Sequence, residues 1–333
     1  MRVAVLALLV GCSFEHGVAL DDATGGDIAT PDGDGRCGLF LDLCGSPAPP
    51  GPLHLVNADT INTDTDPRCL GVMQASGGDV CLVYATMVDI DSGASLTATG
   101  TRPLAIAASG ALTVGGTIDV SSRISGQRGP ASSDTACSFA ATPELDLGGA
   151  GGGAGGSFGL AGGNGGTGDT DQSQGGSDGM GAPGMAGAPA SVTALRGGCR
   201  GQAGANEDAT GGVGGSGGHS GGALYLYAAE SIQISGVIRA TGAGGNGGQV
   251  QAGGGGGGSG GLVVIESPSI VVTGAISANG GGGGEGGARV GSTPVSGQPG
   301  ADGMMGTTAA AGGMGSDNRF GYGGAGGAST EAV

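Results

Sequence analysis

The sequence predicts an all-β protein built as a parallel β-solenoid, in which a repeated unit forms one coil of a β-helix. Three observations support this prediction. A pattern of about twenty residues occurs three times, starting at Leu104, Leu224 and Leu262. Apolar and β-branched residues alternate within each copy, which is the period of a β-strand. The copies keep their internal spacing although loops of very different length separate them, whereas hairpins depend on the turn for their register.

Within each copy the apolar residues predict three short strands, and equivalent residues of neighbouring coils stack about 4.8 Å apart. We expect Leu, Ile, Val and Ala to point into the coil and Thr, Ser, Asp and Arg to face solvent. The alignment matches Leu224 with Leu262, and it matches Val88 with Leu104, which predicts a shortened coil before the first full copy. The alternative is an antiparallel β-sandwich, which needs short turns in place of the long glycine loops. A glycine stands in each copy where the path bends and a left-handed conformation costs little: Gly116, Gly236 and Gly274.

Glycine dominates the rest of the chain. The sequence has 85 glycines among 333 residues, 3% aromatic residues and no tryptophan. Such a chain loses much backbone entropy on folding and has few bulky side chains to offset the loss, so it does not form one conventional core. Gly-X-Y triplets occur only in short runs, which are insufficient for a collagen triple helix. The glycine-rich lobes either stay solvated and flexible or pack as polyproline-II-like strands with paired backbone groups.

The N-terminus has the features of a bacterial export signal. One arginine precedes an apolar run that is too short to span a membrane, and LVGC at 9–12 resembles the lipobox of bacterial lipoproteins. This resemblance implies cleavage before Cys12, lipidation of that cysteine and, with Ser13 after it, transfer to the outer membrane. The alternatives are a buried N-terminal strand with an incidental cysteine and a misplaced start codon.

These features divide the chain into segments. The stretch after the signal is acidic and rich in Gly, Pro and Asp without an apolar period, so we expect a disordered tether. The division is a lipoprotein signal peptide at 1–11, the tether at 12–52, the first part of the solenoid at 53–125, a glycine-rich insertion at 126–222, the second part of the solenoid at 223–280 with a glycine-rich lobe at 242–261, and a glycine-rich C-terminal lobe at 281–333.

The chain is strongly acidic. Its formal net charge is −17, from 28 acidic residues and 11 basic ones, which argues against nucleic acid or an anionic membrane surface as a partner. Asp32 and Asp34 in PDGDG at 31–35 are candidate ligands for calcium, which binds six or more oxygens. The alternative is a plain Asp-Gly turn, because the spacing of an EF-hand loop is absent.

Seven cysteines are present, including Cys12. The even number that remains in an exported chain predicts three disulfides, for which fifteen connectivities are possible. No CxxC pair occurs, which argues against a zinc site and against a thiol oxidoreductase. A bond that closes the large glycine insertion would contribute roughly 4 kcal/mol. Pairing neighbours along the chain gives Cys37–Cys44, Cys69–Cys81 and Cys137–Cys199.

Sequence motifs give little support for catalysis. GxSxG occurs at 214–218 and 257–261, but both lie in glycine-rich segments without the strand and helix that a hydrolase elbow needs. The three histidines, His16, His54 and His219, are isolated and have no metal-ligand spacing.

Asp89 and Asp91 form the best carboxylate pair. They alternate with apolar residues of a predicted strand, so both should project from one solvent face, about 6–7 Å apart. Some solenoid enzymes cleave acidic polysaccharides with carboxylates on such a face, together with charged residues from neighbouring coils. The positions aligned with this pair carry no further charge: Ala105, Ala107, Tyr225, Tyr227, Val263 and Ile265.

The lipobox, the acidic cysteine-bearing tether and the repeat GGALYLYAAESIQISGVIRATG at 221–242, with its sister at 261–280, resemble a known group. They are similar to the glycine-rich surface lipoproteins of myxobacteria and related Gram-negative bacteria. The resemblance implies a lipid-anchored protein of the outer membrane or cell surface, and no activity is established for that group.

We therefore expect a non-enzymatic surface lipoprotein without a cofactor, a structural or adhesive scaffold that displays glycine-rich lobes. Its expected partners are the membrane, through the lipid at Cys12, and extracellular matrix or glycans. The alternatives are a carbohydrate-active β-helix enzyme and a calcium-responsive binding module.

Overall fold

A computed structural model describes the backbone of residues 4–8 and residues 41, 43, 46–74, 76–132, 137–146, 149–168, 181–207, 211–290, 293–314 and 323–327. Strands and extended segments make up these residues, and no helix occurs among them. The prediction of an all-β protein is therefore confirmed for this part of the chain. In the same residues no helix is long and apolar enough to cross a membrane.

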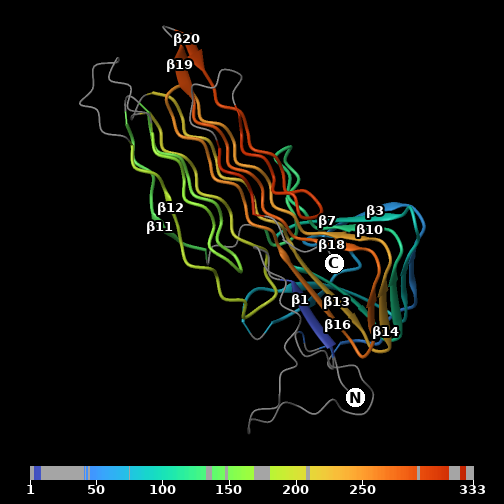
Figure 1. Ribbon diagram of the computed structural model, residues 1–333. Coiled ribbons are helices and arrows are strands. Elements are labelled where there is room, and N and C mark those ends of the chain that lie inside the picture. Colours follow the sequence, from blue (N-terminus) through green and yellow to red (C-terminus); the bar gives the residue numbers. More distant parts are fainter. Residues whose placement is uncertain are drawn as a thin grey trace.

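The repeat folds as predicted into three strands per copy, and each strand joins a different parallel sheet (Figure 1). The first copy forms β8 (Leu104–Ala108), β9 (Ala111–Val114) and β10 (Thr117–Asp119). The second forms β13 (Ala223–Ala228), β14 (Ser231–Ile234) and β15 (Val237–Arg239). The third forms β16 (Leu262–Ser267), β17 (Ile270–Val272) and β18 (Ala275–Ser277).

An earlier copy precedes these three. It comprises β5 (Val80–Ala85), β6 (Val88–Ile90) and β7 (Ser95–Thr99), and before it β2 (Leu53–Leu55) and β3 (Ala58–Asn62) join two of the sheets. The sheet orders are β1-β16-β13-β8-β5-β4, β17-β14-β9-β6-β2 and β18-β15-β10-β7-β3. Antiparallel strands occupy both edges of the first sheet, β1 (Ala4–Leu8) beside β16 and β4 (Leu70–Val72) beside β5.

Most predicted alignments agree with the observed register. Leu112 lies beside Ile232 and Ile232 beside Ile270, and Ile118, Ile238 and Ile276 form a second row. These side chains belong to the core enclosed by the three sheets. Stacking of identical positions therefore removes most of the apolar surface of each copy from water.

Two predicted alignments are wrong. Val88 pairs with Leu112 instead of Leu104, because the earlier copy begins one strand sooner, at β5. Leu262 pairs with Ala223 instead of Leu224, so that Val263 takes the place of Leu262 in the core. A shift of one residue exchanges the two faces of a strand, and alternation could not reveal it here because both faces of β16 are buried.

The first sheet is covered on both sides, which corrects the expectation that its outer face meets solvent. All residues of β5, β8, β13 and β16 are buried. A second apolar cluster lies on the outer face, where Phe158 and Leu195 of the insertion pack against Tyr225. Leu41 and Leu43 belong to the same cluster and are each 2% exposed, so these two residues of the tether are packed rather than disordered.

The bend glycines have a different role from the predicted one. Gly116, Gly236 and Gly274 are not among the glycines with positive φ. A Cβ on Gly236 would lie 1.9 Å from the carbonyl oxygen of Gly116, and one on Gly274 would lie 1.9 Å from that of Gly236. Close stacking of the bends of successive copies, and not a left-handed backbone, therefore requires glycine there.

The glycine-rich segments lie side by side as extended chains next to the sheets (Figure 1). Their backbone groups pair between segments that are far apart in sequence, as in the 2.9 Å bond from the N–H of Gly153 to the carbonyl of Gly254 and the 2.9 Å bond from Gly218 to Gly256. Short antiparallel pairs accompany them: β11 (Phe139–Ala141) with β12 (Met185–Ala186), and β19 (Ala288–Val290) with β20 (Thr293–Val295).

Candidate functional site

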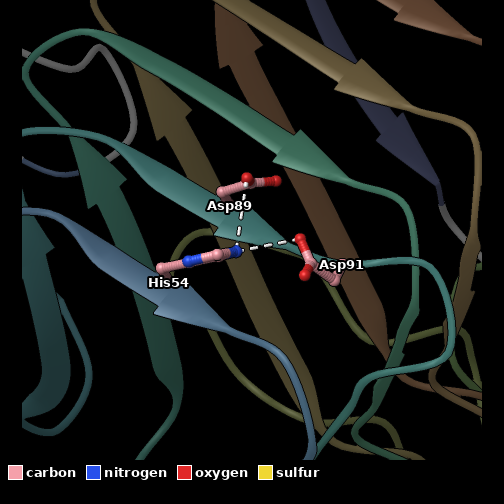
Figure 2. A group of neighbouring side chains, drawn as sticks. All are labelled: His54, Asp89 and Asp91. Carbon is pink, nitrogen blue, oxygen red and sulfur yellow. Dashed lines mark hydrogen bonds and ion pairs between the residues drawn. The ribbon is translucent and has the colours of Figure 1, made fainter.

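Strand pairing brings His54 to the carboxylate pair that the sequence singled out. β2 and β6 are parallel neighbours in which His54 lies opposite Asp89, and Asp91 follows β6 directly. Because Val88 and Ile90 point into the core, the side chains between and after them point outward. Figure 2 shows the imidazole of His54 between the two carboxylates. The expectation that this histidine is isolated is therefore wrong.

The geometry of this cluster is that of a hydrogen-bonded ion pair with a second carboxylate near it. His54 Nε2 donates to Asp91 Oδ1 at 2.9 Å and lies 3.7 Å from Asp89 Oδ2. The side chains of His54, Asp89 and Asp91 are 54%, 44% and 41% exposed. The hydrogen bond to Asp91 and the charge of that carboxylate raise the pKa of His54, and the charge of Asp89 adds to the effect.

We expect an NMR titration to give His54 a pKa above the usual value of about 6.5. In Asp91→Asn the pKa should move back toward that value, while the exposed Asp79→Asn serves as a control with the same change in net charge. The protonated pair favours folding below about pH 6.5, and this contribution disappears as the pH rises through the raised pKa. An unshifted pKa in the wild type would contradict the observed contact.

The same three side chains offer ligand atoms that lie within 4.8 Å of one another, a geometry that could hold a metal ion. One imidazole nitrogen and two carboxylate oxygens suit zinc or another divalent transition metal better than calcium, which binds oxygens alone. Three protein ligands would leave further coordination positions open to solvent. The candidate calcium ligands Asp32 and Asp34 lie outside the described residues.

Along this row of the sheet the later copies of the repeat supply no further charge. Asp89 pairs with Thr113, Thr113 with Gln233 and Gln233 with Val271. The true neighbours thus differ from those of the sequence alignment, since the earlier copy begins one strand sooner. Thr113, Gln233 and Val271 add no acid or base, and the titratable neighbour in this row is His54, which lies opposite Asp89 on β2.

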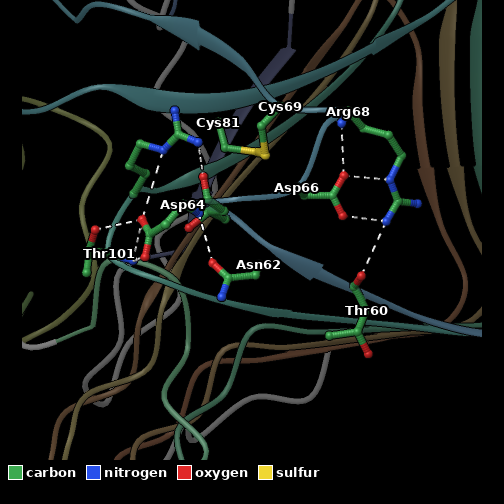
Figure 3. The surroundings of a disulfide bond; sticks show 10 residues. Thr60, Asn62, Asp64, Asp66, Arg68, Cys69, Cys81 and Thr101 are labelled. Carbon is green, nitrogen blue, oxygen red and sulfur yellow. Dashed lines mark hydrogen bonds and ion pairs between the residues drawn. A yellow bond between two sulfur atoms is a disulfide. The ribbon is translucent and has the colours of Figure 1, made fainter.

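A second polar group stabilises the turn that follows β3 (Figure 3). Arg68 donates to Asp66 at 2.8 Å and also contacts Asp59, and these bonds raise the pKa of the guanidinium. The hydrogen bond from Arg68 lowers the pKa of Asp66. Asp64 accepts from the N–H and the hydroxyl of Thr101. The carboxylates of Asp64 and Asp66 therefore stabilise the turn through these hydrogen bonds.

Two of the three suggested disulfides are present, Cys69–Cys81 and Cys137–Cys199. The first lies beside the polar turn in Figure 3 and joins it to β5. The second ties the insertion to itself, and Arg196 lies against it, with a nitrogen 2.9 Å from Cys137 Sγ. Cys12, Cys37 and Cys44 lie outside the described residues.

The GxSxG serines have structural contacts. Ser216 Oγ accepts from Asn246 at 2.7 Å, and Ser259 Oγ accepts from the N–H of Cys199 and donates to the carbonyl of Gly260. His219 is half-buried, and burial, with the charges of Arg200 and Arg128, lowers its pKa to about 4. Neither motif lies between a strand and a helix, so these contacts give no support to a hydrolase elbow.

A buried pair that sequence reasoning missed lies under the insertion. The hydroxyl of Tyr225 donates to Glu266 Oε2 at 2.6 Å, and Glu266 is 2% exposed. Burial and the nearby carboxylate raise the pKa of Tyr225. The sequence signal was a charged residue inside the otherwise apolar run LVVIES, which indicates a buried partner.

A polar cleft of about 1080 Å³ lies between the insertion and the ends of β3 and β7. Arg102, Arg128 and Arg196 line it together with hydroxyl and amide side chains, and Asp79 is the one carboxylate among its lining residues. Arg196 is held by the disulfide sulfurs and by the ring of Phe158, whereas Arg128 is exposed and forms no ion pair with a described carboxylate. Arg102 lies 4.0 Å from Asp64, which partly offsets its charge. The lining itself carries three arginines and one carboxylate, so the cleft is locally basic in an acidic protein.

Comparison with known proteins found no match for the chain among protein-family models, curated proteins or solved structures.

Proposed function

We propose that the protein is a non-enzymatic surface lipoprotein, anchored in the outer membrane through Cys12, that acts as an adhesive scaffold. The observation that carries the proposal is the basic cleft at the junction of the coils and the insertion, which suits an anionic ligand. Beyond Asp89 this row continues with Thr113, Gln233 and Val271, so the later copies add none of the charged residues that a carbohydrate-active solenoid enzyme places on such a face.

The architecture that we propose for the scaffold is a parallel β-solenoid with glycine-rich lobes packed as polyproline-II-like chains. The constant order of three strands per copy supports the solenoid. The spacing of the backbone bonds supports the lobes: the N–H groups of Gly253, Gly256 and Ser259, at intervals of three residues, all donate to the segment 199–205. Polyproline II has three residues per turn, so every third N–H points the same way.

The ligand class that fits the basic cleft is an acidic glycan. Guanidinium groups bind carboxylates, and the hydroxyl and amide side chains of Asn62, Thr101 and Thr193 can bond to sugar hydroxyls. This assignment agrees with the expected contact with matrix or glycans, and it identifies the charge of the glycan as the basis of recognition.

Binding to immobilised polygalacturonate and to neutral galactan tests the function. We expect the chain without residues 1–12 to bind the acidic polymer, with an affinity that falls at high salt. Arg128→Ala should weaken binding about fivefold, the effect of one exposed charge pair worth about 1 kcal/mol. Arg289→Ala, outside the cleft, controls for net charge. Equal binding of both polymers, or no binding, would refute the proposal.

A second candidate, a cation-responsive binding module, is favoured by the cluster of His54, Asp89 and Asp91. Zinc competes with the proton for the imidazole, so adding it during the NMR titration should lower the apparent pKa of His54. Calcium should leave that pKa unchanged. No response to zinc would remove this candidate without affecting the scaffold.

A further inference from the structure

The segment 252–261 lies at the centre of the glycine-rich region and has neighbours on five sides. Each neighbour shares at least one backbone hydrogen bond with it, at 2.7–2.9 Å. The bonds are Gly153 N–H to Gly254 O, Gly253 N–H to Ala205 O, Gly215 N–H to Gly253 O, Gly255 N–H to Asn246 O and Gly284 N–H to Gly255 O.

The N–H groups of this segment divide into three sets at intervals of three residues. One set donates to 199–205, and a second set, from Gly255, Gly258 and Gly261, donates to 240–246. The third set, Gly254, Gly257 and Gly260, has no acceptor in the described part of the chain, although these glycines are buried. Because a polyproline-II chain has three residues per turn, the N–H groups of this third set point away from the neighbours that accept from the first two sets.

That direction leads to a groove of about 200 Å³. Gly254, Gly257 and Gly260 line its floor together with other residues of the same segment, Gly253, Gly255, Gly258 and Ser259. Its sides are 152–156 and 280–286, and its upper walls are 161–167 and 323–327. Each wall is bonded to the side below it, by Gly155 N–H to Gly163 O at 2.9 Å and by Gly283 N–H to Gly324 O at 2.7 Å. The groove therefore has the shape that one additional extended chain would occupy among its neighbours.

We propose that this groove binds a glycine-rich segment of a partner protein, which enters as a polyproline-II strand and becomes the sixth neighbour of 252–261. Its carbonyl groups would accept from Gly254, Gly257 and Gly260, a row of donors that spans about 19 Å at 3.1 Å per residue. The incoming carbonyl groups would satisfy three donors that have no acceptor in the described part of the chain, which favours binding.

Steric spacing selects glycine in the incoming strand. Where chains of this region touch, an added Cβ would lie about 2 Å from a carbonyl oxygen, for example 2.0 Å between Gly253 and Gly151 and 1.9 Å between Gly257 and Gly281. A strand at the same spacing in the groove has no room for side chains toward its neighbours. The partner is thus recognised by its backbone, independently of the basic cleft and of the lipid anchor.

A labelled peptide of Gly-Gly-Ser repeats, long enough to span the groove, is the direct probe. We expect saturable binding by fluorescence anisotropy, together with shifts and slowed hydrogen exchange of the amide protons of Gly254, Gly257 and Gly260. A peptide of Ala-Ala-Ser repeats should bind at least tenfold more weakly. Equal binding of the two peptides, or binding that leaves these amides unchanged, would overturn the proposal.

A matched pair of variants locates the site. In Gly155→Ala the new methyl lies 3.5 Å from Gly163 N and 3.7 Å from Gly257 O, at ordinary contact distance between a wall and the floor. This variant should keep its Tm and lose peptide affinity at least tenfold. Gly78→Ala, where an added Cβ has no atom within 4 Å and which lies outside the groove, should bind as the wild type does. Wild-type affinity in Gly155→Ala would refute the location.

Discussion

Gly256→Ala is expected to lower the free energy of unfolding by more than about 3 kcal/mol, at or beyond the upper end of typical overpacking effects. The added Cβ would lie 1.9 Å from Ala154 O, 2.3 Å from Ala154 C and 2.8 Å from Gly155 N. All three are backbone atoms, so no flexible side chain can move away. Opening the gap would also strain the bond from Gly256 N–H to Gln202 O. Chemical denaturation of the purified variant measures the effect.

Gly155→Ala is the control for this experiment, since it makes the same change one residue from Ala154 on the neighbouring chain. Its methyl has no atom closer than 3.5 Å, so the free energy of unfolding should stay within about 0.5 kcal/mol of the wild-type value. A small effect in both variants would show that these chains are not packed as described. A large effect in both would show that the space around Gly155 is tighter than described, because replacing glycine with alanine does not by itself cost backbone entropy.

The second large effect concerns the disulfide that closes the insertion. Replacing both Cys137 and Cys199 with serine should lower the free energy of unfolding by about 4 kcal/mol, because the bond spans a separation of 62 residues. The corresponding change at Cys69 and Cys81, with a separation of 12 residues, should cost about 3 kcal/mol. Denaturation of both double variants gives the comparison.

The relative size of the two losses in the free energy of unfolding tests the entropic explanation. A larger loss for Cys69 and Cys81 would contradict it, and would point to the polar turn around Arg68 as the dominant element there. Reduction of the wild-type protein before denaturation provides a control that breaks both disulfides and leaves all four sulfur atoms in place.

Periodicity was sufficient to predict the strands and most of their stacking. Rows such as Ile118, Ile238 and Ile276 were predictable because one face of these strands meets solvent and alternation is visible. Periodicity gave the wrong register for β16 and for the earlier copy, because their strands in the first sheet are buried on both faces. Continuous apolar runs such as VCLVYA carry no information on which side chain faces the core.

The candidate site was less predictable than the fold. Asp89 and Asp91 were identified from their spacing, but His54 is 37 residues from Asp91 and reaches it only through strand pairing. A correct prediction of the pairing of β2 with β6 would have placed His54 beside Asp89. The groove could not be predicted at all, because it depends on which glycine-rich segments become neighbours, and their composition is nearly uniform.

The close contacts between glycine chains limit how this region can change. In an ordinary apolar core, enlarging one side chain can be compensated by shrinking its neighbour. Around Gly256 the neighbouring atoms are backbone, and glycine has no smaller replacement. A substitution at such a position therefore has no second-site suppressor among the contacting residues, so individual glycines of a low-complexity segment can be as constrained as the side chains of an apolar core.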